Sequence, residues 1–273
     1  MLKSDLMRVQ VVPCLSDNLS YLVVDEPSRT CVIIDPGEAT PFLEAIERDG
    51  LTPIAILATH HHYDHVGGIS ELPALPVWSS KRDLDRIPGS QRHTYRAENA
   101  RLSWAELAAR PTTSPQNPSP LTDATISLQV LPIPGHTQGQ VALLFSDTDS
   151  ADAANAPAVF VGDTLFSFGC GRCLEGTPDE LFASLQKLKG LPPESRLYFG
   201  HEYTERNALF WMTHLDEPEI QATLQNLSAQ NLSASSGYPR PAPSLKEELR
   251  LNPFLKIKNA SEFRHWRSLR DQF

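Results

Sequence analysis

The sequence predicts an α/β protein in which helices cover a mixed β-sheet. Segments typical of strands come first in the chain and then alternate with segments of helical periodicity, an order that indicates a sheet with helices packed on it. Several of these strands also end in a polar residue followed by a turn. At 273 residues, the chain is long enough for one large core, or for a core with a smaller appendage.

The expected elements follow from hydrophobic periodicity and turn signals. Strands are expected at residues 11–14, 21–25, 31–35, 54–59, 126–132, 141–145, 159–162 and 196–199. One helix is expected at 41–48. Another should run from Pro178 to about Lys189, because Thr177 and Glu180 fit a capping box with proline at the first helical position.

The last quarter of the chain has a different pattern. Beyond residue 200 it is helical, with Ile220, Leu224 and Leu227 on one face, and it ends in a basic helix. Polar or Pro/Ser-rich stretches at 110–121, 147–157 and 233–243 are expected to be exposed loops. We therefore expect one domain over residues 1–200 and a helical one over residues 201–273.

Composition restricts the possible partners. The formal net charge of −9 argues against nucleic acid, because phosphate binding normally needs a basic surface. The charge is uneven, since residues 240–273 hold eight Lys/Arg against four acidic residues. An anionic small molecule could be steered to that end of the chain.

The cellular compartment is predicted from three features: the signal peptide, the membrane span and the disulfide framework that the sequence does not show. Residues 1–10 do not resemble a signal peptide, and no apolar run approaches the roughly 20 residues that a membrane span needs. The four cysteines are too few and too scattered for a disulfide framework, which favours the cytoplasm. Cys170 and Cys173 have CxxC spacing, but without a second pair we expect no metal or redox role for them.

The segment THHHYDHVGG at residues 59–68 predicts a metal site. It follows a buried strand, unlike a terminal purification tag. His60 and His62 point the same way only if the strand continues extended, and they can then bind one ion. Asp64 and His65 follow too closely to reach that ion, so they suggest a second ion beside it. His61 points the other way and is expected to be structural or to support the ligands.

Three further strand ends carry residues that can bind metal, namely His136 in PIPGHTQGQ, Asp163 in FVGDTLF and His201 in LYFGHEYT. Ligands from separate strands can converge at one rim of a sheet. We expect His60, His62 and His136 to hold one ion. Asp64, His65 and His201 should hold the other, with Asp163 bridging both. Histidine and carboxylate ligands suit zinc, iron or manganese.

The pattern resembles the metallo-β-lactamase fold hydrolases, and more finely the glyoxalase II (hydroxyacylglutathione hydrolase) family. The resemblance covers nearly the whole chain, through SDNLSYLVVD, THHHYDHVGG, PGHTQG, GDTLFSFGCGRCLEGT, GHEYT, NPFL and RSLRDQF. It implies a four-layer αββα sandwich over residues 1–200, followed by a helical glutathione-binding domain. It also implies hydrolysis of S-lactoylglutathione to glutathione and D-lactate, the second step of methylglyoxal detoxification. We expect a monomer in the cytoplasm.

Four residues match the family's glutathione contacts by position: Arg172, Tyr203, Arg267 and Arg270. Leu174 stands where family members often carry a tyrosine, which removes one hydrogen bond to glutathione. Asp64 and Asp163 are the expected catalytic residues. Two ions about 3.5–4 Å apart can share a hydroxide that attacks the thioester, and Asp64 could also orient it. A thiol of pKa about 8.5 leaves without a dedicated acid.

Three other functions are compatible with part of this pattern. A persulfide dioxygenase shares HxHxDH but uses one iron and lacks the long basic tail. A phosphodiesterase or nuclease is disfavoured by the negative charge. A non-catalytic scaffold would have lost ligands, whereas all seven are present.

Overall fold

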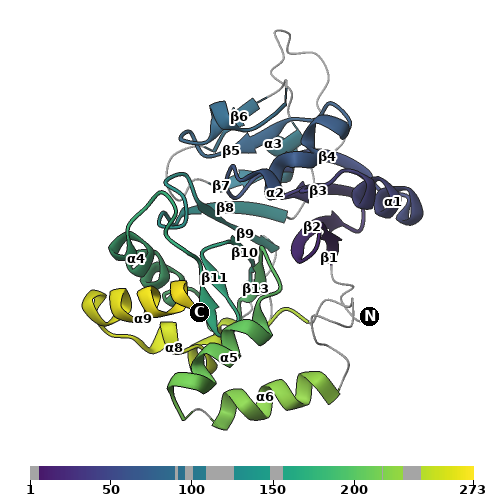
Figure 1. Cartoon of the computed structure of the whole chain (residues 1–273). Coiled ribbons are helices and arrows are strands. Elements are labelled where there is room, and N and C mark those ends of the chain that lie inside the picture. The colour runs from purple at the N-terminus through teal and green to yellow at the C-terminus, as the bar shows by residue number, and fades with distance from the viewer. Residues whose placement is uncertain are drawn as a thin grey trace.

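Two stacked β-sheets form the centre of the molecule, and helices cover their outer faces (Figure 1). The computed structural model describes residues 6–89, 92–95, 101–108, 126–147, 156–216, 218–229 and 241–273. The expected α/β class with a four-layer arrangement is confirmed.

The first sheet has the strand order β1-β2-β3-β4-β5-β6. The first three strands are antiparallel, and the last three add in parallel, so the sheet is mixed. Its strands are β1 (Met7–Cys14), β2 (Asn18–Asp25), β3 (Thr30–Ile34), β4 (Thr52–Leu57), β5 (Val77–Ser79) and β6 (Arg92–Thr94).

The second sheet has the order β13-β10-β9-β8-β7 and is antiparallel except for the pair β10 and β13. Its strands are β7 (Arg101–Ser103), β8 (Ile126–Pro132), β9 (Val141–Asp147), β10 (Ala158–Gly162) and β13 (Arg196–Phe199). A small hairpin of β11 (Leu165–Phe166) and β12 (Gly169–Cys170) follows β10.

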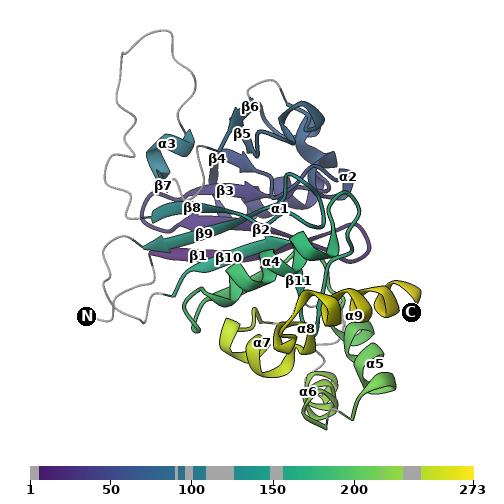
Figure 2. The ribbon, with the colours of Figure 1, turned by 90° about the vertical axis from the view of Figure 1, so that its left-hand side faces the viewer.

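The helices lie outside the sheets. They are α1 (Thr40–Asp49), α2 (Tyr63–Val66), η1 (Gly67–Glu71), η2 (Leu84–Arg86), α3 (Trp104–Ala108), α4 (Pro178–Lys189), α5 (Thr204–His214), α6 (Pro218–Ala229), α7 (Leu245–Leu251), α8 (Pro253–Lys256) and α9 (Ala260–Gln272). Figure 2 shows α5 to α9 gathered at one end of the molecule, on the same side as α4. Within the described residues, none of the helices combines the length and the apolar character needed to cross a bilayer.

Side-chain alternation along the strands separates the layers. Val23 of β2 packs between the two sheets with Phe145 and Phe160, whereas its neighbour Leu22 packs on the other face with Phe42 of α1. On the far face of the second sheet, one core joins β10, α4 and the C-terminal helices. The two sheets are thus fixed against each other, and the loops at one edge can hold a site.

The observed elements follow the expected ones closely in the strongly apolar segments. The capping box of Thr177 and Glu180 is present and begins α4. β1 begins at Met7, before the expected start at residue 11. Its first five residues are only half-buried and include polar Arg8 and Gln10, so the sequence shows no apolar run there. The short strands β5, β6, β7, β11 and β12 and the helix α3 were not expected.

Some expectations fall outside the described residues. The loop at 110–121 lies there entirely, as do most of the loops at 147–157 and 233–243. The division at residue 200 stays a prediction. Side chains from both sides of it share one core, in which Phe254 and Phe263 pack with Leu181 and Leu185.

Candidate metal centre

The segment after β4 is held extended by a buried aspartate. Thr59 donates its backbone N–H and its hydroxyl to the Asp35 carboxylate, at 2.7 and 2.6 Å. Asp35 itself has φ 51°, a left-handed conformation that aspartate tolerates better than most residues. His62 remains extended, with φ −59° and ψ 143°, and α2 begins at the next residue. The short helix α2 therefore starts inside the histidine motif.

Three imidazoles meet in a first group made of His60, His62 and His136. Their ligand atoms lie within 4.8 Å of one another. Nδ1 of His62 is 3.1 Å from Nε2 of His60 and 3.0 Å from Nε2 of His136. Three nitrogens converging on one small volume is an arrangement suited to one metal ion.

A second group is formed by Asp64, His65 and His201, whose ligand atoms are equally close. Oδ2 of Asp64 lies 3.3 Å from Nε2 of His201 and 3.6 Å from Nε2 of His65. The structure thus brings together the same two sets of three residues that the sequence spacing suggested. A third possible group, of Asp35, His60 and His65, overlaps both.

Asp163 lies between the two main groups, at the end of β10. Its Oδ2 is 3.5 Å from Nε2 of His136 and 3.3 Å from Nε2 of His201, and its Oδ1 is 3.4 Å from Nε2 of His65. One carboxylate therefore contacts members of both groups. Oδ1 of Asp163 and Nε2 of His65 are buried without a hydrogen bond among the described residues, as expected of atoms that face an ion.

The outward-facing nitrogen of four histidines has its own partner. Nδ1 of His136 donates to the Arg172 carbonyl at 2.9 Å, and Nδ1 of His201 lies 2.9 Å from the Asp17 carboxylate. Nδ1 of His65 lies 3.1 Å from Oδ2 of Asp35, and Nδ1 of His60 lies 3.1 Å from the hydroxyl oxygen of Thr59. Such partners fix the ring so that its other nitrogen faces the metal.

Sequence reasoning missed the supporting residues Asp17, Asn18 and Asp35. Asn18 donates to Oδ2 of Asp64 at 3.0 Å and to its backbone carbonyl at 3.1 Å. Asp17 and Asn18 belong to the SDN segment, which was noted only as part of the family resemblance. The turn signal after Asp35 marked a sharp bend, but not that the carboxylate holds Thr59.

The electrostatics of the two groups differ. Burial lowers the pKa of His60 well below its usual value, and burial with the nearby His136 lowers that of His62 to about 4. Burial also lowers the pKa of His136. The three histidines of the first group are therefore neutral at pH 7. In the second group, burial alone would lower the pKa of His201 too, but the charge of Asp163 raises it to about 10.

The second group holds positive charge on its own histidines. Burial opposes the charge on His65, but Asp163 and Asp35 raise its pKa well above the usual range. Burial would raise the pKa of Asp163, yet His65 and His201 hold it well below its ordinary value. The carboxylates of Asp163 and Asp35 thus favour positive charge on these imidazoles, and a site that favours positive charge suits a metal cation.

A cavity of about 180 Å³ lies beside the second group, because two of its lining residues, Phe166 and Tyr203, contact the ring of His201. It is lined by Phe166, Cys170, Arg172, Tyr203, Arg206, Asn207, Arg267 and Arg270. All four residues that matched glutathione contacts line it, and Arg206 was not anticipated. Burial and the neighbouring Arg267 lower the pKa of Arg270 to about 10, which indicates a strongly positive environment.

Three of these arginines also bind the protein itself. Arg172 donates to the Asp271 carbonyl at 2.9 Å. Arg267 is only 3% exposed and donates to the carbonyls of Cys170 and Gly171, at 2.7 and 3.2 Å. Arg270 donates to Oδ1 of Asn207 at 3.0 Å. Gly171 has no room for a side chain, because a Cβ there would lie 1.8 Å from the Asp163 carbonyl. Arg267 therefore supports the turn that packs against the metal centre.

Leu174, the two nearby cysteines and His61 lie outside the two ligand groups. Leu174 is 59% exposed, and its N–H donates to the His136 carbonyl at 3.1 Å. Cys170 and Cys173 are free thiols, and burial raises the pKa of Cys173 to about 12. His61 contacts Asp83 and Glu175, facing away from the first group as the alternation suggested.

Comparison with known proteins decides the family. Residues 16–201 match the family model described as the metallo-beta-lactamase superfamily. A curated hydroxyacylglutathione hydrolase of Xanthomonas campestris is 37% identical over 255 residues, covering 92% of this chain and 86% of the relative. This chain belongs to the metallo-β-lactamase superfamily and, within it, to the hydroxyacylglutathione hydrolase family.

Two further comparisons agree. A hydroxyacylglutathione hydrolase of Pelagibacter ubique is 35% identical to this chain over 276 residues, covering 98% of this chain and all of the relative. A protein crystallised in a di-iron-bound form is 28% identical, with a TM-score of 0.55, covering 89% of this chain and 98% of that one. The superfamily and the two residue groups together indicate a binuclear metal site.

Proposed function

We propose that this chain is a hydroxyacylglutathione hydrolase, which cleaves S-lactoylglutathione and related 2-hydroxyacyl thioesters to glutathione and a 2-hydroxy acid. The names of its relatives support a hydrolase over a persulfide dioxygenase. The observation that carries the proposal is the contact between the metal centre and the arginine-lined cavity. Tyr203 lines that cavity and stacks on His201, at 4.8 Å between ring centroids.

The proposed ion ligands are the two residue groups with Asp163 between them. Zinc is the proposed metal, and iron and manganese suit the same donors. When bound, two such ions supply an activated water molecule and a Lewis acid for the thioester carbonyl. Asp163 holds the two groups together, and Asn18 keeps the Asp64 carboxylate turned toward His201.

Glutathione suits the cavity because it carries two carboxylates. Arg172 and Arg206 line the cavity with the more buried Arg267 and Arg270, and the planar guanidinium group binds carboxylates in a forked geometry. The tripeptide would then sit beside Tyr203, with its sulfur directed toward His201. The thiolate leaves without a proton donor, since its pKa of about 8.5 makes it a good leaving group.

We also propose a cytoplasmic monomer that binds neither nucleic acid nor membrane. The four free cysteines suit a reducing compartment, and the net charge of −9 disfavours nucleic acid.

The proposal is tested by replacing Asp163. Asp163→Ala should lose both bound metal and cleavage of S-lactoylglutathione, by about 100-fold or more, because the carboxylate contacts both groups. Metal analysis and a thioester assay measure the two losses. The exposed Asp216→Ala is the matched control and should behave as wild type. A variant at 163 with two ions per chain and normal turnover would refute the assignment.

A further inference from the structure

His61 is the one histidine of the THHHYDH run that neither group of ligands includes, yet it is only 8% exposed. Its Nδ1 lies 3.1 Å from Oδ1 of Asp83, and its Nε2 lies 3.4 Å from Oε1 of Glu175. Neither nitrogen has a well-aligned hydrogen bond among the described residues. The two carboxylates are the charged groups in contact with the ring. The ring is therefore fixed between two acids on the side away from the first group.

Asp83 connects His61 to the loop that carries His136. Asp83 is 1% exposed, and a Cβ added at Gly139 would lie 2.1 Å from its Oδ1. The backbone at Gly139 is therefore packed directly on the Asp83 carboxylate. Any side chain at 139 would have to displace that carboxylate, so the position of Asp83 and the path of the chain after His136 depend on each other.

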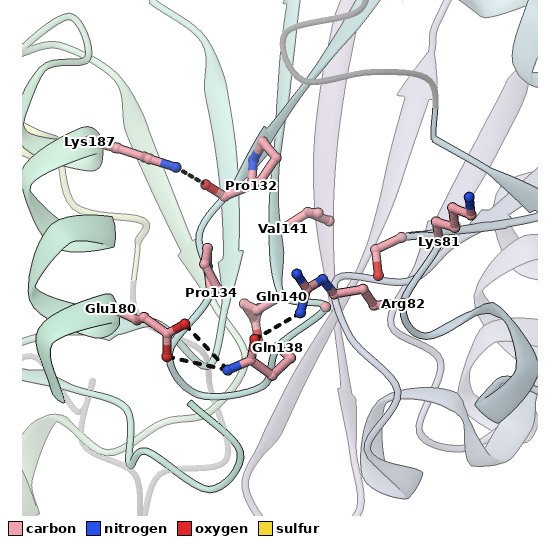
Figure 3. Close-up of a pocket in the computed structure, with 11 residues that line it drawn as sticks. Lys81, Arg82, Pro132, Pro134, Gln138, Gln140, Val141, Glu180 and Lys187 are labelled. Atoms are coloured by element: carbon pink, nitrogen blue, oxygen red, sulfur yellow. Dashed lines mark hydrogen bonds between the residues drawn. The ribbon is translucent and has the colours of Figure 1, made fainter. Parts of the chain in front are cut away.

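Glu175 makes a second connection to the same loop. Its carboxylate accepts hydrogen bonds from the Gln138 N–H at 3.2 Å and from Arg86 at 2.5 Å, and its own N–H donates to the His136 carbonyl at 3.2 Å. The side chain of Gln138 lies between Arg82 and Glu180, bonded to both (Figure 3). Glu175 thus joins His61 to the backbone of His136 and to that of Gln138, two residues further along the same loop.

We propose that His61 is a positioning residue for the first ion, acting through Asp83 and Glu175 on the alignment of His60 and His62 with His136. Alternate residues of an extended segment face opposite sides, so holding the ring of His61 outward holds its two neighbours inward. The two acids belong to elements that also contact the loop of His136. This inference rests on the two-ion centre proposed above.

The test measures metal affinity rather than turnover alone. Chelator competition on purified His61→Gln and Glu175→Gln should show one of the two stepwise dissociation constants raised about 10- to 100-fold, the usual effect of losing a ligand's support. The other constant should stay within about threefold. Asp17→Asn, which alters the partner of His201, is the matched comparison and should weaken the other ion. His93→Gln controls for loss of a histidine outside the site.

Two further measurements separate positioning from a general loss of structure. The melting temperature of metal-free His61→Gln should stay close to that of wild type, and kcat should fall more than KM rises. The double variant with Glu175→Gln should lose little more than either single variant, since both act through one contact. Wild-type affinity in His61→Gln, additive losses, or equal weakening of both ions would overturn the inference. If wild type itself bound fewer than two ions, the proposed function would fail instead.

Discussion

The rings of His201 and Tyr203 stack face to face, with centroids 4.8 Å apart and planes 4° from parallel. His201 belongs to the second ligand group, whereas Tyr203 lines the arginine cavity. This pair is therefore a direct physical link between the proposed metal site and the proposed substrate site.

Two replacements of Tyr203 should distinguish the role of its ring from the role of its hydroxyl. Tyr203→Phe keeps the stack, so it should leave metal affinity and kcat nearly unchanged and raise KM by no more than a few fold. Tyr203→Ala removes a ring contact of about 0.5–1.5 kcal/mol, and should weaken metal binding by up to about tenfold and lower kcat. Steady-state kinetics with metal analysis would test this. Equal behaviour of the two variants would argue that the stack does not matter.

Replacing Arg270 and replacing Arg267 should have different effects on KM and kcat. Arg270→Ala should raise KM for S-lactoylglutathione by about tenfold with little change in kcat, because it removes a contact to a remote carboxylate. Arg267→Ala should lower kcat as well, since Arg267 also holds the carbonyls of Cys170 and Gly171 beside Asp163. A thioester of a small neutral thiol is the control substrate and should be insensitive to Arg270→Ala. An unchanged KM for glutathione thioesters in Arg270→Ala would contradict this role.

Asn252 should be important for stability. It is fully buried, donates to the carbonyls of Phe166 and Gly169 at 2.9 and 3.0 Å, and accepts from the Phe254 N–H at 3.1 Å. Asn252→Ala leaves buried groups unpaired and should lower the free energy of unfolding by about 3 kcal/mol. Asn259→Ala removes only a helix cap and should cost about 1 kcal/mol. Chemical denaturation compares them, and similar losses would be evidence against this interpretation.

How far the sequence predicts this molecule depends on how local each signal is. The histidine motif and the strand-end residues His136, Asp163 and His201 were visible because each follows an apolar strand. The partners Asp17 and Asp35, and the contact of His61 with Asp83, join segments far apart in the sequence, so no local pattern reveals them. Strands of two or three residues, such as β11 and β12, are too short for periodicity to show.

The thiol of Cys173 should be unreactive at neutral pH. Burial raises its pKa to about 12, so the folded protein holds it as the neutral thiol through pH 7–10, and alkylation should keep rising above pH 9 instead of levelling off there. Cys173→Ser should leave kcat and metal content nearly unchanged. Iodoacetamide labelling followed by mass spectrometry measures this. Rapid labelling at pH 7, or loss of activity in the serine variant, would mean that the Cys170/Cys173 pair has a role.

The most direct test of the two-ion thioester hydrolase is a metal titration of the chelator-stripped protein. The rate of S-lactoylglutathione cleavage is followed as zinc, iron or manganese is added in known equivalents. The account predicts that the rate rises until two equivalents per chain are bound and then stays constant, because both ligand groups and Asp163 act together. A plateau at one equivalent, or no cleavage by protein that has bound two ions, would contradict it.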